Sequence, residues 1–158
     1  MRKVFFVCTG NTCRSPMAEA FLKDIVSRDP VLRDEISVAS GGLAAFEGEK
    51  ASRHAIAVMK DKWGININDH RASFLSEDKV KEAFLILVMT NSQKRYLMGR
   101  YPWAADKIFT ISAYADPDCE YCDIDDPYGM PPEVYERCAE QLKKAVEMVA
   151  EKLKKELE

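Results

Sequence analysis

Two side chains with strong chemistry of their own, Cys8 and Arg14, lie near the start of the chain in the run Cys8-Thr9-Gly10-Asn11-Thr12-Cys13-Arg14-Ser15. The apolar residues 4–7 before this run predict a buried strand. Ser15-Pro16 at its end predicts a helix start, with the serine as N-cap and the proline as first helical residue. A loop between a strand and a helix N-terminus directs backbone N–H groups and the positive end of the helix dipole into one concavity. The sequence therefore predicts an anion-binding loop after the first strand.

The residue types of this loop are those that a nucleophilic attack on phosphorus requires. The positive field of the helix start and of the Arg14 guanidinium stabilises Cys8 as a thiolate, the nucleophilic form of cysteine. The planar fork of arginine matches two oxygens of one phosphate. Gly10 lets the backbone approach a ligand closely, and Asn11 tolerates the left-handed conformation that such loops often need. The loop thus combines a nucleophile with a cradle for an oxyanion.

Other interpretations of the loop are weaker. A cysteine at the end of an apolar strand is usually a small buried residue, but its spacing from Arg14 and Ser15 favours chemistry at Cys8. A nucleotide-binding Walker loop ends in Gly-Lys-Ser or Gly-Lys-Thr, where this chain has Cys-Arg-Ser. The chain has no Gly-x-Gly-x-x-Gly motif, which disfavours a dinucleotide site.

The elements that must position this loop alternate along the chain. The pattern predicts strands over residues 4–7, 36–40, 84–89 and 107–111, and helices over residues 17–28, 51–63, 92–101 and 132–158. This alternation predicts an α/β fold: a doubly wound, four-stranded parallel sheet with helices on both faces and the phosphate-binding loop after strand 1. Residues 115–130, rich in Asp, Pro and Cys, predict an irregular acidic loop.

Length and composition limit the class of protein. The chain has 158 residues, 47% of them hydrophobic and 31% charged, which predicts a single globular domain over residues 1–158. The net charge of -3, with no isolated basic run, disfavours a nucleic-acid partner. No segment has the length and apolar character of a membrane span or a signal peptide, so we expect a cytoplasmic protein without a membrane partner. Five irregularly spaced cysteines predict free thiols.

The run from Cys8 to Glu19 resembles the signature of the low-molecular-weight protein tyrosine phosphatases. The second hallmark of that family, an Asp-Pro-aromatic loop late in the chain, occurs as Asp126-Pro127-Tyr128, and the resemblance covers essentially the whole chain. Tyrosine phosphatases of the family tend to carry a bulky aliphatic residue where this chain has Thr12. In this respect the sequence is most similar to the bacterial protein-arginine phosphatase branch.

The resemblance implies a role for each matching residue. The implied catalytic residues are the nucleophile Cys8, which forms a cysteinyl-phosphate, Arg14, and the proton donor Asp126, whose neighbour Asp125 is the competing choice. The substrate-binding residues are expected to be Thr9, Gly10, Asn11, Thr12 and Cys13 in the loop, with Phe46 and Tyr128 as walls of the cleft. A network that braces the loop is expected from Asn11, Ser15, Ser40 and His70. The family resemblance implies phosphorylated proteins as substrates, and we expect neither a metal nor a cofactor.

Some alternatives stay open at this point. Thr12 and the acidic residues near Asp126 suit the guanidinium of phosphoarginine, whereas Phe46 and Tyr128 suit the ring of phosphotyrosine. A thioredoxin-coupled arsenate reductase shares the fold and the cysteine loop but needs further cysteines. Cys119-Glu120-Tyr121-Cys122 keeps that alternative open, and the pair is equally a weak metal half-site or a redox staple. Cys13 either forms a reversible disulfide with Cys8 or is a small loop residue.

Overall fold

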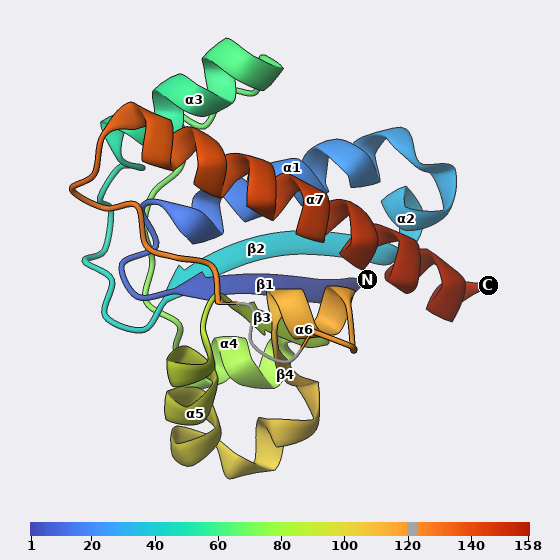
Figure 1. Cartoon of the computed structure of the whole chain (residues 1–158). Coiled ribbons are helices and arrows are strands. Elements are labelled where there is room, and N and C mark those ends of the chain that lie inside the picture. The colour runs from blue at the N-terminus through green and yellow to red at the C-terminus, as the bar shows by residue number, and fades with distance from the viewer. Residues whose placement is uncertain (120–122) are drawn as a thin grey trace.

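The computed structural model describes residues 1–119 and 123–158. Its centre is a four-stranded parallel sheet in the order β2-β1-β3-β4 (Figure 1). The strands are β1 (Arg2–Cys8), β2 (Ile36–Gly42), β3 (Leu85–Val88) and β4 (Ile108–Thr110). From β1 the chain first adds β2 on one side and then β3 on the other. The carboxyl ends of β1 and β3 therefore frame the crevice where ligands of doubly wound sheets bind.

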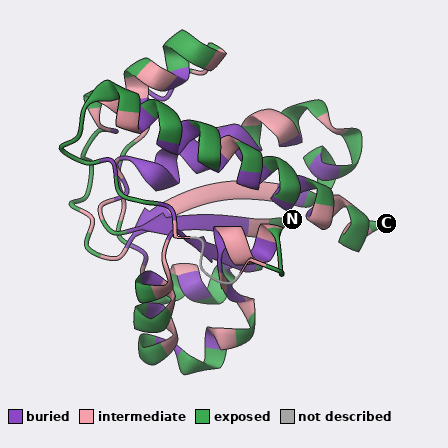
Figure 2. Ribbon diagram, viewed as in Figure 1, coloured by how far each residue is buried: buried purple, intermediate pink, exposed green. Residues whose placement is uncertain are grey.

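Helices cover both faces of the sheet, as the alternating pattern predicts. The helices α1 (Arg14–Arg28) and α7 (Pro132–Leu157) lie on one face, while α4 (Glu77–Glu82) and α5 (Asn91–Arg100) lie on the other (Figure 1). Both strands at the centre of the sheet, β1 and β3, are almost entirely buried (Figure 2). This burial explains why their sequences are continuous apolar runs rather than alternating ones.

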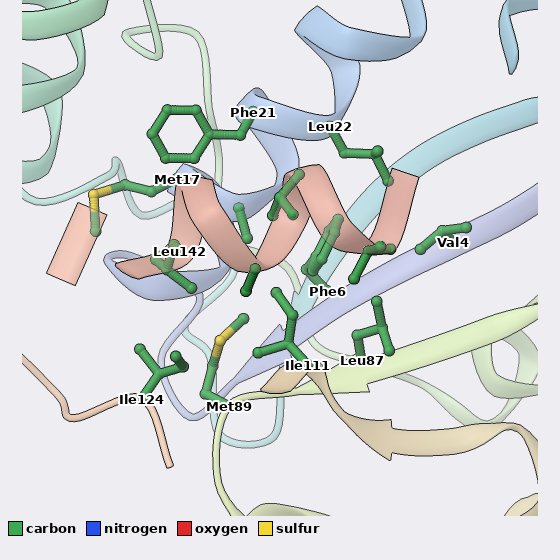
Figure 3. Close-up of a cluster of buried hydrophobic side chains, with 14 of the residues drawn as sticks. Val4, Phe6, Met17, Phe21, Leu22, Leu87, Met89, Ile111, Ile124 and Leu142 are labelled. Carbon is green, nitrogen blue, oxygen red and sulfur yellow. The ribbon is translucent and has the colours of Figure 1, made fainter. Parts of the chain in front are cut away.

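The two faces of β1 supply two hydrophobic clusters. Val4 and Phe6 pack into the larger cluster, which contains residues of α1 and α7 such as Leu22 and Leu142 (Figure 3). Phe5 and Val7 point to the opposite face and pack in the smaller cluster, which contains residues of β3 and α5. The side chains of a strand alternate between the faces of its sheet. Because both faces of β1 are packed, the position of Cys8 at its carboxyl end is fixed.

Most predicted element boundaries are confirmed within a few residues. Helix α3 (Arg53–Trp63) follows the N-cap Ser52 and ends at Gly64, which has the left-handed φ of 64°. The side chain of Ser76 accepts a bond from Lys79 N and caps α4. The long helix predicted over residues 132–158 is α7. These are places where local capping chemistry decides the structure.

The structure corrects the predicted start of the first long helix. Helix α1 begins at Arg14, and Cys13 occupies the N-cap position without any side-chain capping bond. Ser15 is therefore not the N-cap. Its hydroxyl lies instead near Cys8 and Asn11, so the tertiary contacts of the loop override the local capping preference.

Short elements account for the remaining differences. The last strand ends at Thr110, because the Thr110 side chain accepts a bond from Ala113 N and starts α6 (Ile111–Ala115). The prediction of a strand through Ile111 and an irregular segment from residue 115 was wrong at Ile111 and Ala115, which are helical. Helix α2 (Pro30–Glu35), capped by Asp29, and the 3-10 helix η1 (Pro102–Lys107) were not predicted.

Candidate active site

The loop between β1 and α1 turns sharply at Asn11. Asn11 has a φ of 57°, the only positive φ of a non-glycine residue in the described ranges, and its side chain is fully buried. Its Nδ2 donates to Ser15 Oγ at 2.8 Å and to Ser40 Oγ at 2.9 Å. Its Oδ1 accepts a bond from Ser73 N at 3.0 Å. These bonds hold the strained conformation that turns the loop.

A further contact reaches the Asn11 backbone from His70. His70 Nε2 lies 2.7 Å from Asn11 O, a geometry in which the ring N–H donates to the carbonyl. The Glu19 carboxylate accepts a bond from Ser40 Oγ and lies 3.8 Å from His70 Nδ1. The structure therefore brings together all four residues expected in the bracing network, and it adds Glu19.

Cys8 and Ser15 form a buried pair at the base of the loop. Cys8 Sγ lies 2.9 Å from Ser15 Oγ, and the cysteine is 3% exposed. The two atoms are within hydrogen-bond distance, and either of them could be the donor. A cysteine that ends a buried strand beside a helix N-terminus is thus held in a single position for attack.

Arg14 is almost fully buried, with 5% of its side chain exposed. Its Nη1 donates to the backbone carbonyl of Ile124 at 2.7 Å, which fixes the direction of the guanidinium. Its Nε is buried and has no hydrogen-bond partner among the residues described. A buried donor without a partner favours binding of an oxyanion, because the anion satisfies the donor that burial has removed from water.

The segment that carries Asp126 is anchored to the carboxyl end of β3. Ile124 N donates to Met89 O at 2.9 Å, and Asn91 N donates to Asp123 Oδ1 at 2.9 Å. Asp126 Oδ2 lies 3.7 Å from Arg14 Nη2, and just over half of the Asp126 side chain is exposed. The carboxylate is therefore close to the loop and still open to solvent.

These groups surround one cavity of about 260 Å³. It is lined by Cys8, Thr9, Gly10, Thr12, Cys13, Arg14, Ala44, Phe46, Glu49, Asp126 and Tyr128. Of the residues expected to be catalytic or to bind substrate, only Asn11 is absent from this lining. Phe46 and Tyr128 stand at the mouth, 78% and 72% exposed. Asp125 does not line the cavity, which favours Asp126 as the acid.

Gln93 is a further residue that holds the loop in place, and the sequence analysis did not predict this role. Gln93 is buried, its Oε1 accepts bonds from Met89 N and Thr90 N, and its Nε2 donates to Thr9 Oγ1 at 3.2 Å. The Thr90-x-x-Gln93 spacing of a capping box is visible in the sequence. Its contact with Thr9 is not visible there, because it depends on β1 and β3 being neighbours.

The described cysteines occupy different environments. Cys8, Cys13 and Cys138 are free thiols, as the sequence predicts for them. Cys13 Sγ lies 3.5 Å from Tyr135 Oη, and burial, with a smaller contribution from this bond, raises the pKa of Tyr135 to about 12. Burial also raises the pKa of the Cys138 thiol to about 12, so Cys138 is an unreactive core residue.

Cys119 is disulfide-bonded, so the prediction of free thiols is wrong for this cysteine. Cys122, the other member of the predicted Cys119–Cys122 pair, lies outside the described residues. Within residues 1–119 and 123–158, no group of three or more His, Cys, Asp or Glu side chains is arranged to hold a metal ion. No helix in that part of the chain combines the length and the apolar character that crossing a bilayer requires.

A cysteine and an arginine on one anion-binding loop, with a carboxylate opposite them, are the parts of a cysteine-dependent phosphatase. The comparison with protein families agrees with this class. The model described as "Low molecular weight phosphotyrosine protein phosphatase" matches residues 3–158. The chain therefore belongs to this family and is a phosphoprotein phosphatase.

Individual relatives cover nearly the whole chain. It is 40% identical to a protein-arginine-phosphatase of Geobacillus stearothermophilus over 98% of this chain and 97% of the relative. The solved structure of the YwlE arginine phosphatase from that organism matches with a TM-score of 0.89, covering 99% of this chain and 95% of the other. A low molecular weight protein tyrosine phosphatase from T. tengcongensis matches with a TM-score of 0.86 and 45% identity, covering 96% of this chain and 99% of the other.

Proposed function

We propose that this phosphatase hydrolyses phosphoarginine residues of proteins in preference to phosphotyrosine, and that the cavity at the Cys8 loop is its active site. The preference for phosphoarginine is inferred from the position of Thr12, which lines the cavity together with the nucleophile Cys8. Its backbone carbonyl accepts a bond from Ser52 N at 2.8 Å, so its position is fixed. A hydroxyl there offers a hydrogen bond to a guanidinium, whereas an aliphatic side chain would pack against a phenol ring. The similarity to a protein-arginine-phosphatase supports this preference.

In the proposed first step, the Cys8 thiolate attacks phosphorus in line with the leaving nitrogen. A sulfur–phosphorus bond forms as the phosphorus–nitrogen bond breaks, and Asp126 gives its proton to the departing nitrogen. Arg14 and the backbone N–H groups of the loop hold the remaining phosphoryl oxygens. The buried, unpartnered Nε of Arg14 supports this role.

In the second step, water attacks phosphorus and Asp126 takes its proton. The sulfur–phosphorus bond then breaks, inorganic phosphate leaves and the Cys8 thiolate is regenerated. The exposure of Asp126 supports this exchange of a proton with water. We propose four positioning residues: Asn11, Ser15, Ser40 and His70. Their hydrogen bonds fix the loop, and the residues themselves do not line the cavity.

Phosphotyrosine is the second candidate substrate. The exposed rings of Phe46 and Tyr128 at the mouth of the cavity favour it, because they can enclose a flat leaving group. The similarity to the T. tengcongensis tyrosine phosphatase supports it as well. The arsenate reductase alternative gains no support, because the relatives reported above are phosphatases.

The test measures phosphate release by the reduced protein from a phosphoarginine peptide and a phosphotyrosine peptide of otherwise identical sequence. We expect wild type to favour phosphoarginine in kcat/KM, and Thr12→Ile to lower that ratio at least about tenfold, because a hydrogen bond to a charged group is lost. Thr12→Val keeps the volume but not the hydroxyl, so it should also lose activity on phosphoarginine. A wild-type preference for phosphotyrosine would refute the proposal.

We further infer that the chain acts as one domain in the cytoplasm. The free thiols of Cys8, Cys13 and Cys138 suit a reducing compartment, where a cysteine nucleophile stays active. Phosphorylated proteins are the substrates that membership of the family implies.

A further inference from the structure

Glu49 is a residue of the cavity to which neither the motif nor the catalytic scheme gives a role. It comes from the loop that follows β2 and lines the same cavity as Cys8, Thr12 and Asp126. The cavity is therefore bordered by two carboxylates, Glu49 and Asp126, and by a single cationic side chain, Arg14. This balance is unusual for a site that must accept a doubly negative phosphoryl group.

The backbone holds Glu49 at this place. Ala72 N donates to Glu49 O at 2.7 Å, and Glu49 N donates to Phe46 O at 3.3 Å. The next residue, Lys50, forms an antiparallel bridge with Arg71. Glu49 is thus fixed in the same short loop as Phe46 and does not depend on a mobile terminus for its position.

Within residues 1–119 and 123–158, the carboxylate of Glu49 has no counter-ion. It takes part in no hydrogen bond or ion pair with any other residue that the structure describes, and it is exposed. By contrast, the neighbouring Glu47 accepts a bond from Phe74 N at 2.6 Å and is used within the fold. An unpaired carboxylate on the wall of a phosphate site repels the substrate anion unless the substrate itself brings a cation.

We propose that Glu49 is a specificity-determining residue that binds the guanidinium of the phosphoarginine substrate. The inference rests on the proposed function and extends it. Asp126 protonates the nitrogen that leaves phosphorus. Glu49 accepts a hydrogen bond from another nitrogen of the same guanidinium, one that is not bonded to phosphorus. A phenyl phosphate offers no group for this contact, so Glu49 favours phosphoarginine and opposes phosphotyrosine.

The test compares wild type, Glu49→Gln and Glu151→Gln on three peptides. The first carries phosphoarginine and no other basic residue, the second carries phosphotyrosine in the same sequence, and the third adds a lysine beside the phosphotyrosine. Glu151 is an exposed residue of α7 that does not line the cavity, so Glu151→Gln controls for the same change of net charge.

For Glu49→Gln we expect KM for the phosphoarginine peptide to rise about tenfold, with kcat within a factor of about two, because a charge-assisted contact made in both ground and transition states is lost. KM for the plain phosphotyrosine peptide should stay equal or fall. Glu151→Gln should behave as wild type on all three peptides.

The outcomes separate this inference from the proposed function. Wild-type preference for phosphoarginine together with an unchanged KM in Glu49→Gln would overturn the role of Glu49 alone. A loss confined to the lysine-containing peptide would also overturn it, because Glu49 would then bind a flanking residue of the substrate. A wild-type preference for phosphotyrosine would overturn both.

Discussion

The floor and the mouth of the cavity are built in opposite ways. The floor is formed by the loop from Cys8 to Arg14, in which Cys8, Asn11 and Arg14 are at most 4% exposed and only Thr9 is classed as exposed. The rings of Phe46 and Tyr128 at the mouth are more than 70% exposed. The floor is held by hydrogen bonds within the protein, whereas the rings at the mouth have few internal contacts.

This difference separates the chemistry from the choice of substrate. A floor that internal hydrogen bonds hold in place before the substrate arrives presents a phosphoryl group with fixed donors and a fixed nucleophile, which is the arrangement that lowers a barrier most. The exposed rings at the mouth are available to contact a bound substrate. Changes at the floor should therefore affect kcat and stability, and changes at the mouth should affect KM.

Substitution of Asp126 gives the largest expected effect on kcat. This residue tests the boundary between the two regions, because it is exposed like the residues of the mouth but is proposed to transfer a proton in the reaction. Asp126→Asn should lower kcat on a phosphopeptide about 10²- to 10³-fold, because the leaving group loses its proton donor. Asp125→Asn, a change of the neighbouring carboxylate outside the cavity lining, should cost no more than about threefold. Steady-state phosphate release measures both.

An activated aryl phosphate sharpens this experiment. Its leaving group departs without a proton, so Asp126→Asn should lose much less on it than on the phosphopeptide. If Asp125→Asn shows the larger loss, the acid has been assigned to the wrong residue.

The same division explains what could be predicted from the sequence. The floor is one continuous segment, so the apolar strand, the cysteine, the arginine and the helix start are all visible in local order. The mouth is assembled from segments far apart in the chain, and Phe46 and Tyr128 were expected there only through a family resemblance. The doubly wound sheet was predictable because buried parallel strands are apolar throughout.

The errors and omissions have the same physical origin. Ser15 was expected to cap α1, but the hydroxyl is used by Cys8 and Asn11, which only the folded loop brings within reach. The contact of Gln93 with Thr9 and the place of Glu49 in the cavity have no local signal, because contacts between separate elements decide them. Local preferences yield where tertiary contacts at the site compete with them.

Asn11 gives the next effect and tests whether the floor is held by its hydrogen bonds. Asn11→Gly tolerates the φ of 57° but loses the side-chain bonds to Ser15, Ser40 and Ser73, so we expect it to lower the free energy of unfolding by about 2–3 kcal/mol. Asn11→Ala should lose about 1 kcal/mol more, because alanine is strained at positive φ. Urea unfolding measures these differences.

Both Asn11 variants should also lower kcat about tenfold or more, since a displaced loop no longer aligns its donors with the phosphoryl group. Equal stability of the glycine and alanine variants would show that backbone strain at position 11 does not affect the free energy of unfolding. Wild-type kcat in both would show that the floor does not need Asn11.

Phe46 gives the smallest expected effect and tests the mouth by itself. Phe46→Ala removes a ring that is 78% exposed, so the free energy of unfolding should stay within about 0.5 kcal/mol of wild type. KM should rise about three- to tenfold with kcat nearly unchanged, because the ring contacts the substrate equally in the ground and transition states. Phe84→Ala, which removes an exposed ring outside the cavity lining, is the matched control and should leave KM unchanged. A fall in kcat for Phe46→Ala, with KM unchanged, would mean that the mouth takes part in the chemistry and that the two regions are not separate.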